Sequence, residues 1–114
     1  MNYDLLLHVD TDASALSMAI KNASNYVNAI ESEKYTIAIV VNGKAVAWLL
    51  RTTCPTPEIL SKLCSGNVRL YVCNNAIREH GINPEDLIPE AIVVPAGIVH
   101  IVKLQREGFA YVKP

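Results

Sequence analysis

The stretch VRLYVCNNAIREHG places a cysteine where a thiol can do chemistry. Its first part, Val68–Val72, is a short apolar run typical of a strand, and Cys73 follows it directly. Asn74 and Asn75 come next, and a short helical pattern then closes at Gly81. Asparagine is a preferred helix N-cap residue, and glycine is the preferred residue just after a helix. We therefore expect Cys73 between the end of a strand and the start of a helix.

This position favours the reactive form of a thiol. Open α/β sheets bind their ligands at the carboxyl ends of the strands. A helix N-terminus favours negative charge, and therefore favours thiolate over thiol. The alternative is that Cys73 only packs in the core, because free cysteine is among the most buried residue types. On these residues alone both interpretations stay open.

The other cysteines and histidines give weaker signals. Cys64 lies on the apolar side of a predicted helix, so we expect it in the core, and Cys54 lies in a loop with Arg51 as its basic neighbour. We expect His80 on the surface and His100 in a packed or interface position. The three cysteines show no CxxC or CxxH spacing, which argues against a disulfide framework and a zinc site.

Composition narrows the class of protein. The chain has 114 residues, of which 51% are hydrophobic, and this suits one domain over residues 1–114. A formal charge of −1 gives no electrostatic reason to bind nucleic acid or an anionic membrane. The longest apolar run, Tyr35–Val41, is too short to span a bilayer. The first residues lack the features of a signal peptide, and unpaired cysteines suit a reducing compartment, so we expect a cytoplasmic protein.

Strands alternate with helices along the chain. The predicted strands are apolar runs: Tyr3–Val9, Tyr35–Val41, Val68–Val72, Ala91–Val94 and Phe109–Val112. The predicted helices are a long one after Asp12, Lys44–Leu50, one from Pro57 to before Gly66, Ala76–His80, a single turn after Asn83, and Ile98–Glu107. Strands that are apolar on both faces suit a buried parallel sheet. The alternation predicts an α/β fold with helices covering that sheet through right-handed crossovers.

A parallel sheet would collect a defined set of residues at its carboxyl edge. Successive strands deliver His8 and Asp10, then Asn42 and Gly43, then Cys73 and Asn74, and finally Pro95, Ala96 and Gly97. Helix starts at Asn74–Asn75 and Ala96–Gly97 offer backbone N–H groups that suit an anion or a thiolate. A cysteine with a nearby histidine is the general form of an activated thiol. Whether His8 reaches Cys73 depends on the strand order, which the sequence does not determine.

Several common site signatures are absent from the sequence. No GxGxxG follows a strand and no GxxxxGK[ST] occurs, which argues against a dinucleotide site and a P-loop. No GxSxG elbow occurs either. The histidines are scattered singly and form no metal-ligand pattern. We therefore expect neither a metal nor a cofactor.

From end to end, the chain resembles the DsrE/DsrF-like family. The resemblance rests on the order and spacing of LLLHVD, Asn22 in the first helix, NG after the second strand, VRLYVCNNAIREHG, VVPAGIVHIVKLQ and GFAYVKP. It implies a three-layer α/β/α sandwich with a five-stranded, mostly parallel sheet. In the sulfur-trafficking members, a cysteine at the end of the third strand carries persulfide sulfur. Cys73 is the position in this sequence that matches that cysteine.

The resemblance favours a cytoplasmic sulfur-relay role, and two alternatives stay open. In that role Cys73 would carry persulfide sulfur between a donor and an acceptor thiol, and His8 would orient or deprotonate it. The sulfur-relay members work as heteromers, so a donor or acceptor protein is an implied partner. One alternative is a module that binds a small anion or a nucleotide on Asp10, Asn42, Gly43, Asn74, Asn75, Ala96 and Gly97. The other is a structural subunit of an oligomer, and the Asn74-Asn75 pair is similar to stand-alone members whose activity is largely unassigned.

A surplus of apolar residues predicts that the chain is not a monomer. The last helix carries apolar residues on more than one side: Ile98, Val99, Ile101, Val102 and Leu104. A surplus apolar face usually marks an interface. The alternative is that the loop around Leu87–Pro89 covers it. We expect a closed, symmetric homo-oligomer, and the resemblance favours a trimer or hexamer.

Overall fold

One five-stranded sheet forms the centre of the computed structural model, which describes residues 2–30 and 34–114. The strands are β1 (Leu5–Val9), β2 (Ile37–Val41), β3 (Val68–Cys73), β4 (Ala91–Val94) and β5 (Ala110–Val112). Their order across the sheet is β4-β3-β2-β1-β5, and every neighbouring pair is parallel. The predicted α/β class and the five-stranded sheet are therefore confirmed.

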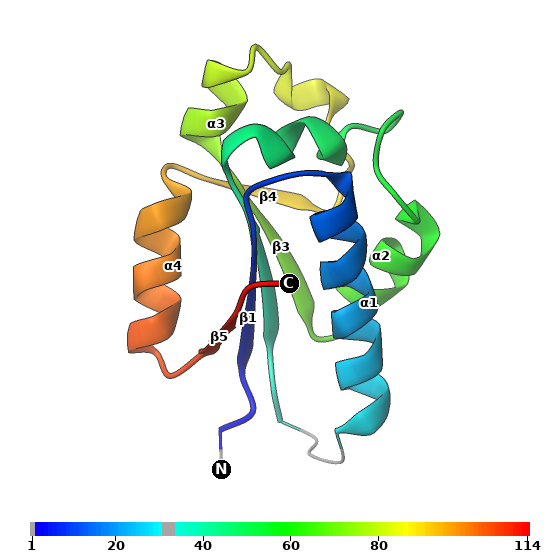
Figure 1. The fold of residues 1–114 in the computed structure, drawn as a ribbon, viewed down its shortest axis with the longest axis vertical. Coiled ribbons are helices and arrows are strands. Elements are labelled where there is room, and N and C mark those ends of the chain that lie inside the picture. Colours follow the sequence, from blue (N-terminus) through cyan, green and yellow to red (C-terminus); the bar gives the residue numbers. More distant parts are fainter. Residues whose placement is uncertain (1, 31–33) are drawn as a thin grey trace.

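Helices cover both faces of this sheet. They are α1 (Ala13–Ala29), α2 (Pro57–Cys64), α3 (Asn74–Glu79) and α4 (Gly97–Arg106), with the 3₁₀ segments η1 (Gly43–Leu49) and η2 (Pro84–Asp86). Figure 1 shows α4 on one side of the sheet and α1 and α2 on the other, which gives the three layers of an α/β/α sandwich. Within the described part of the chain, no helix has the length and apolar character needed to cross a membrane.

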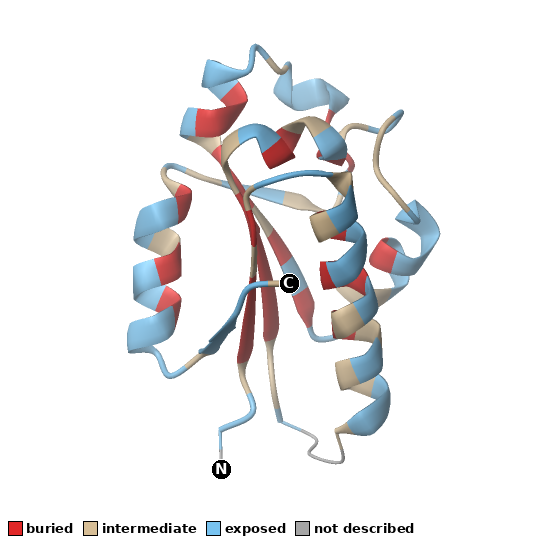
Figure 2. Cartoon of the chain, in the orientation of Figure 1, coloured by how far each residue is buried: buried red, intermediate tan, exposed pale blue. Residues whose placement is uncertain are grey.

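The two faces of the sheet bury unequal cores. The larger cluster packs the sheet against α1, η1, α2 and α3, and includes Leu7, Leu16, Ile39, Leu49, Leu60 and Leu70. The smaller cluster lies under α4 and consists of Leu6, Ala38, Val40, Ile101 and Leu104. Every residue of β2 belongs to one of these clusters, so the strand is buried along its whole length (Figure 2). This burial on both faces explains why Tyr35–Val41 is the longest apolar run of the sequence.

Helix α3 starts earlier than the asparagine pair predicts. Asn74 and Asn75 are the first residues of the helix, and Cys73 holds the N-cap position in an extended conformation with φ −72° and ψ 118°. The expected asparagine cap is wrong because β3 continues through Cys73 and the chain then turns directly into the helix. Asn75 uses its side chain inside the helix, where Oδ1 accepts a hydrogen bond from Arg78 at 2.8 Å.

The short helix predicted over Lys44–Leu50 is present as the 3₁₀ helix η1, Gly43–Leu49. The apolar side chains of Ala45, Val46 and Leu49 are buried as an amphipathic helix requires. The carbonyl of Leu49, however, accepts from the backbone N–H of Ile88 at 2.9 Å, outside the helix. A short connector that binds its last carbonyls elsewhere is a common place for 3₁₀ geometry.

Truncating the centre of β2 tests this description of the core. Ile39 is 0% exposed, so Ile39→Ala should leave a cavity and lower the free energy of unfolding by about 2–5 kcal/mol. Urea unfolding followed by circular dichroism measures the change. The matched control is Ile59→Ala, because the Ile59 side chain on α2 is 47% exposed. The control should stay within about 0.5 kcal/mol of the wild type, and equal losses in both variants would contradict the placement of the core.

Candidate functional site

Three adjacent strands bring polar side chains together at the carboxyl edge of the sheet. Strand β2 lies between β1 and β3. The register pairs Val9 with Val41 and Val41 with Val72. Asn42 and Cys73 therefore follow at the same level on neighbouring strands. This is the edge where parallel sheets bind their ligands.

Cys73 is buried against the start of α4. Its side chain is 7% exposed. A Cβ placed on Gly97, the first residue of α4, would stand 3.2 Å from the Cys73 Cβ and 3.1 Å from the Asn42 Cβ. Glycine is therefore required at position 97 because the helix start lies so close to Cys73 and Asn42, and not because of its backbone conformation. The preceding residue, Ala96, occupies the N-cap position and supplies no side-chain hydrogen bond to the first turn of α4.

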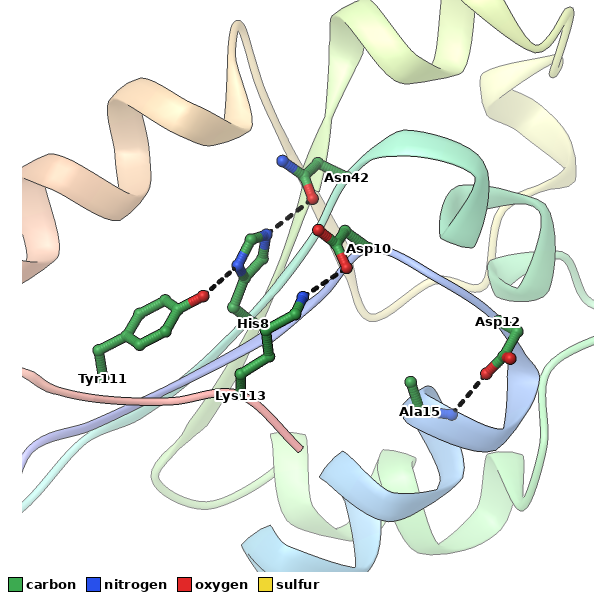
Figure 3. Close-up of polar contacts among 7 residues, drawn as sticks. All are labelled: His8, Asp10, Asp12, Ala15, Asn42, Tyr111 and Lys113. Atoms are coloured by element: carbon green, nitrogen blue, oxygen red, sulfur yellow. Dashed lines mark hydrogen bonds and ion pairs between the residues drawn. The ribbon is translucent and has the colours of Figure 1, made fainter.

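His8 contacts Asn42 and Tyr111. The Asn42 Oδ1 atom can only accept, so the His8 Nε2–H donates to it, at a distance of 2.9 Å. The His8 Nδ1 atom lies 2.6 Å from the Tyr111 hydroxyl (Figure 3). Both ring nitrogens thus have partners other than Cys73. Whether His8 reaches Cys73 depends on the strand order. Because β2, with Asn42, lies between the strands of His8 and Cys73, His8 meets Asn42 instead.

Asp10 and Gly43 lie beside this group. The Lys113 ammonium donates to Asp10 Oδ1 at 2.5 Å, and this hydrogen bond is the main reason why the pKa of Asp10 lies below its ordinary value. Both side chains are well exposed, so the pair contributes about 0–1 kcal/mol to stability. Gly43 has φ 59°, and a Cβ there would stand 3.3 Å from the Asp10 carbonyl oxygen. Glycine is therefore needed where the chain leaves β2.

The remaining predicted site residues sit in the two helix starts. Asn74 and Asn75 form the first turn of α3, directly after Cys73, and Ala96 precedes α4. The structure therefore brings the beginnings of α3 and α4 to the same cysteine. Two residues of this region were missed from the sequence, Tyr111 and Lys113 of the C-terminal segment. Only the pairing of β5 with β1 places them beside His8 and Asp10.

His100 packs on the same face of the sheet, one turn along α4 from Gly97. Its ring contacts the Tyr71 ring in a tilted arrangement, with ring centroids 4.2 Å apart and an interplanar angle of 50°. Burial is the main cause that lowers the pKa of His100, and the Lys103 ammonium adds to it. Among the residues that the structure describes, its buried Nε2 atom has no hydrogen-bond partner. The predicted packed position agrees with this contact.

Cys54 and Cys64 occupy a different environment from Cys73. Both are partly buried against the larger core cluster and are free thiols. Burial is the main cause that raises the pKa of each thiol to about 11, and the Glu90 carboxylate raises both further. At neutral pH only about one molecule in ten thousand would carry a thiolate at either position. These two cysteines are therefore poor nucleophiles.

A methyl group on Gly97 tests the close packing at Cys73. Gly97→Ala would press a Cβ onto Cys73 and Asn42, and such overpacking costs about 1–3 kcal/mol of unfolding free energy. Chemical denaturation gives the value. Gly66→Ala is the matched control, because its nearest neighbour is the Leu63 carbonyl oxygen at an ordinary 3.5 Å. A Gly97→Ala protein as stable as this control would show that α4 does not approach the strand ends so closely.

Comparison with known proteins confirms the resemblance. The model of the DsrE/DsrF-like family matches residues 5–114. The solved structure of MTH1491, a protein of unknown function from Methanobacterium thermoautotrophicum, is 32% identical with a TM-score of 0.87, and the match covers 99% of this chain and 100% of that chain. A search of curated proteins gave no match. Since the family model spans nearly every residue and the fold agrees, the chain belongs to the DsrE/DsrF-like family.

Proposed function

We propose that this protein is a sulfur carrier of the sulfur-relay type, with Cys73 as the persulfide site. The observation that carries the proposal is the position of Cys73 at the carboxyl edge of the sheet, against the first residue of α4 and beside the Asn42 amide. Helix N-termini favour a nearby negative charge, and the reactive form of the cysteine is an anion. Family membership supports the same role, because the matching cysteine of sulfur-trafficking members carries persulfide.

The transfer conserves both atoms and electrons. The Cys73 thiolate attacks the terminal sulfur of a donor persulfide R–S–SH. A new S–S bond forms to Cys73, the S–S bond of the donor breaks, and the donor leaves as the thiolate R–S⁻. An acceptor thiolate R′–S⁻ then attacks the outer sulfur of Cys73–S–SH, which yields R′–S–SH and returns Cys73 as thiolate. No external oxidant or reductant is required, because one sulfur atom moves between thiols.

The neighbouring polar residues have distinct tasks in this proposal. The Asn42 amide nitrogen lies at the first residue of α4, as Cys73 does. It would supply a hydrogen-bond donor to the anionic sulfur, and hydrogen bonds to an anion are stronger than neutral ones. His8 acts through Asn42 and not as a direct base, since its Nε2–H is engaged by Asn42 Oδ1. Backbone N–H groups of Asn74, Asn75 and Gly97 add to the favourable field for a negative sulfur.

Intact-mass spectrometry after incubation with a small-molecule persulfide tests the function. The wild type should gain the mass of one sulfur atom, because Cys54 and Cys64, with thiol pKa values of about 11, remain protonated. The adduct should persist in Cys54→Ser and Cys64→Ser and disappear in Cys73→Ser. The absence of an adduct from persulfide, polysulfide and thiosulfate donors would contradict the proposal. That result would favour a module that only binds a small anion.

We further propose that the carrier works as a cytoplasmic homo-oligomer. Helix α4 leaves a strip of apolar side chains uncovered in the single chain, with Ile98 63%, Val99 65% and Val102 45% exposed. These exposed fractions argue against the alternative that the loop around Leu87–Pro89 covers the strip. Burying such a face against further copies would remove it from water, with about 25 cal/mol gained per Å² of apolar surface.

Light scattering behind a sizing column tests the assembly. One chain has a mass of 12.5 kDa, and we expect a threefold or sixfold multiple at micromolar concentration. Val99→Lys should lower the mass toward that of one chain, because it places a charge in the exposed apolar strip. Ile59→Lys on α2 is the control and should leave the mass unchanged. A wild-type mass near that of one chain would contradict the assembly.

A further inference from the structure

The edge strand β5 supplies a residue that reaches the site through two hydrogen bonds. We infer that Tyr111 is a positioning residue: its hydroxyl donates to His8 Nδ1 and, together with Asn42 Oδ1, holds His8 in the Nε2–H tautomer. His8 in turn holds the Asn42 amide nitrogen toward the first residue of α4, which Cys73 also approaches. The inference deepens the proposed function, on which it rests for the role of Cys73. Tyr111 has no contact with the reacting sulfur and acts through His8 and Asn42.

The two hydrogen bonds of the His8 ring determine its tautomer. A neutral imidazole has one N–H donor and one acceptor nitrogen. The Asn42 Oδ1 atom accepts, so at 2.9 Å it requires the proton on His8 Nε2. The His8 Nδ1 lone pair then accepts the Tyr111 O–H, at 2.6 Å. The Tyr111 ring also tilts against the imidazole, with centroids 5.7 Å apart and an interplanar angle of 58°.

The hydrogen bond to His8 sets the orientation of the Asn42 amide. With Oδ1 held by His8, the Nδ2 group must point the other way, and Figure 3 shows it directed away from the His8 ring. The Nδ2 atom lies 3.6 Å from the Cβ position on Gly97, and the Cys73 Cβ lies 3.2 Å from that same point. The Asn42 amide nitrogen and the Cys73 Cβ therefore both lie at the first residue of α4.

Strand β5 has a limited structural role. The strand has three residues, all exposed, and it lies at the edge of the sheet, paired with β1. Tyr111 is 41% exposed, although its hydroxyl turns onto His8. Removal of that hydroxyl therefore changes the hydrogen bonds of the site while the ring and the backbone pairing remain. Tyr111→Phe is consequently a clean test.

Nitrogen-15 NMR of the histidine ring measures the tautomer of His8 directly. The wild type at mildly alkaline pH should show His8 as the Nε2–H tautomer, and Tyr111→Phe should show a mixture of both neutral tautomers. Tyr26→Phe is the matched control, because it removes a hydroxyl that donates to the Tyr3 carbonyl. It should leave the His8 signals unchanged. An Nδ1–H tautomer in the wild type, or the same tautomer in Tyr111→Phe, would overturn the inference.

The rate at which iodoacetamide alkylates Cys73 measures how the Tyr111 hydroxyl affects the reactivity of this thiol. In a Cys54→Ser, Cys64→Ser background, Tyr111→Phe should slow alkylation about threefold to tenfold, the effect of losing one oriented hydrogen bond. Tyr26→Phe should not slow it. An unchanged rate in Tyr111→Phe, or equal slowing in both variants, would overturn the positioning role. Neither measurement uses a sulfur donor, so failure to form a persulfide would contradict the proposed function alone.

Discussion

The pairing of β1, β2 and β3 in parallel register is the constraint on which the site depends. Strand β2 can hold the central place because all five of its side chains are buried, in one core or the other. Its neighbours then deliver His8 and Cys73 to either side of Asn42. A shift of one residue in this register would turn each of these side chains to the opposite face and exchange the side chains that β2 gives to the two cores. The hydrophobic core therefore holds the polar edge in place.

The unequal covering of the sheet gives the site its surroundings. Among the residues that the structure describes, several helical elements cover one face, whereas α4 alone packs on the other. This single helix begins at Gly97, in contact with Cys73, and packs His100 onto Tyr71 further along. It also leaves Ile98 and Val99 uncovered. The same helix thus shields the cysteine on its inner side and offers an apolar surface on its outer side.

Much of the fold follows from the sequence, whereas the details of the site do not. The alternation of apolar runs and amphipathic stretches predicts the five strands and the position of Cys73. Strand order is a non-local property, so the engagement of His8 by Asn42 and Tyr111 could not be read from spacing. The asparagine cap was wrong because the tendency of Asn74 to cap a helix is weaker than the continuation of β3 through Cys73. No sequence pattern indicates a role for Tyr111, because only the pairing of β5 with β1 brings it beside His8.

The passage of a labelled sulfur atom through Cys73 tests the central claim most directly. The protein would be loaded from a radiolabelled persulfide, freed of the donor, and then mixed with an acceptor thiol. The predicted result is one labelled sulfur per chain, located on Cys73 by peptide mapping and then recovered on the acceptor. Label that stays on the protein after the acceptor is added, or that maps to Cys54 or Cys64, would contradict the role of Cys73 as a sulfur carrier.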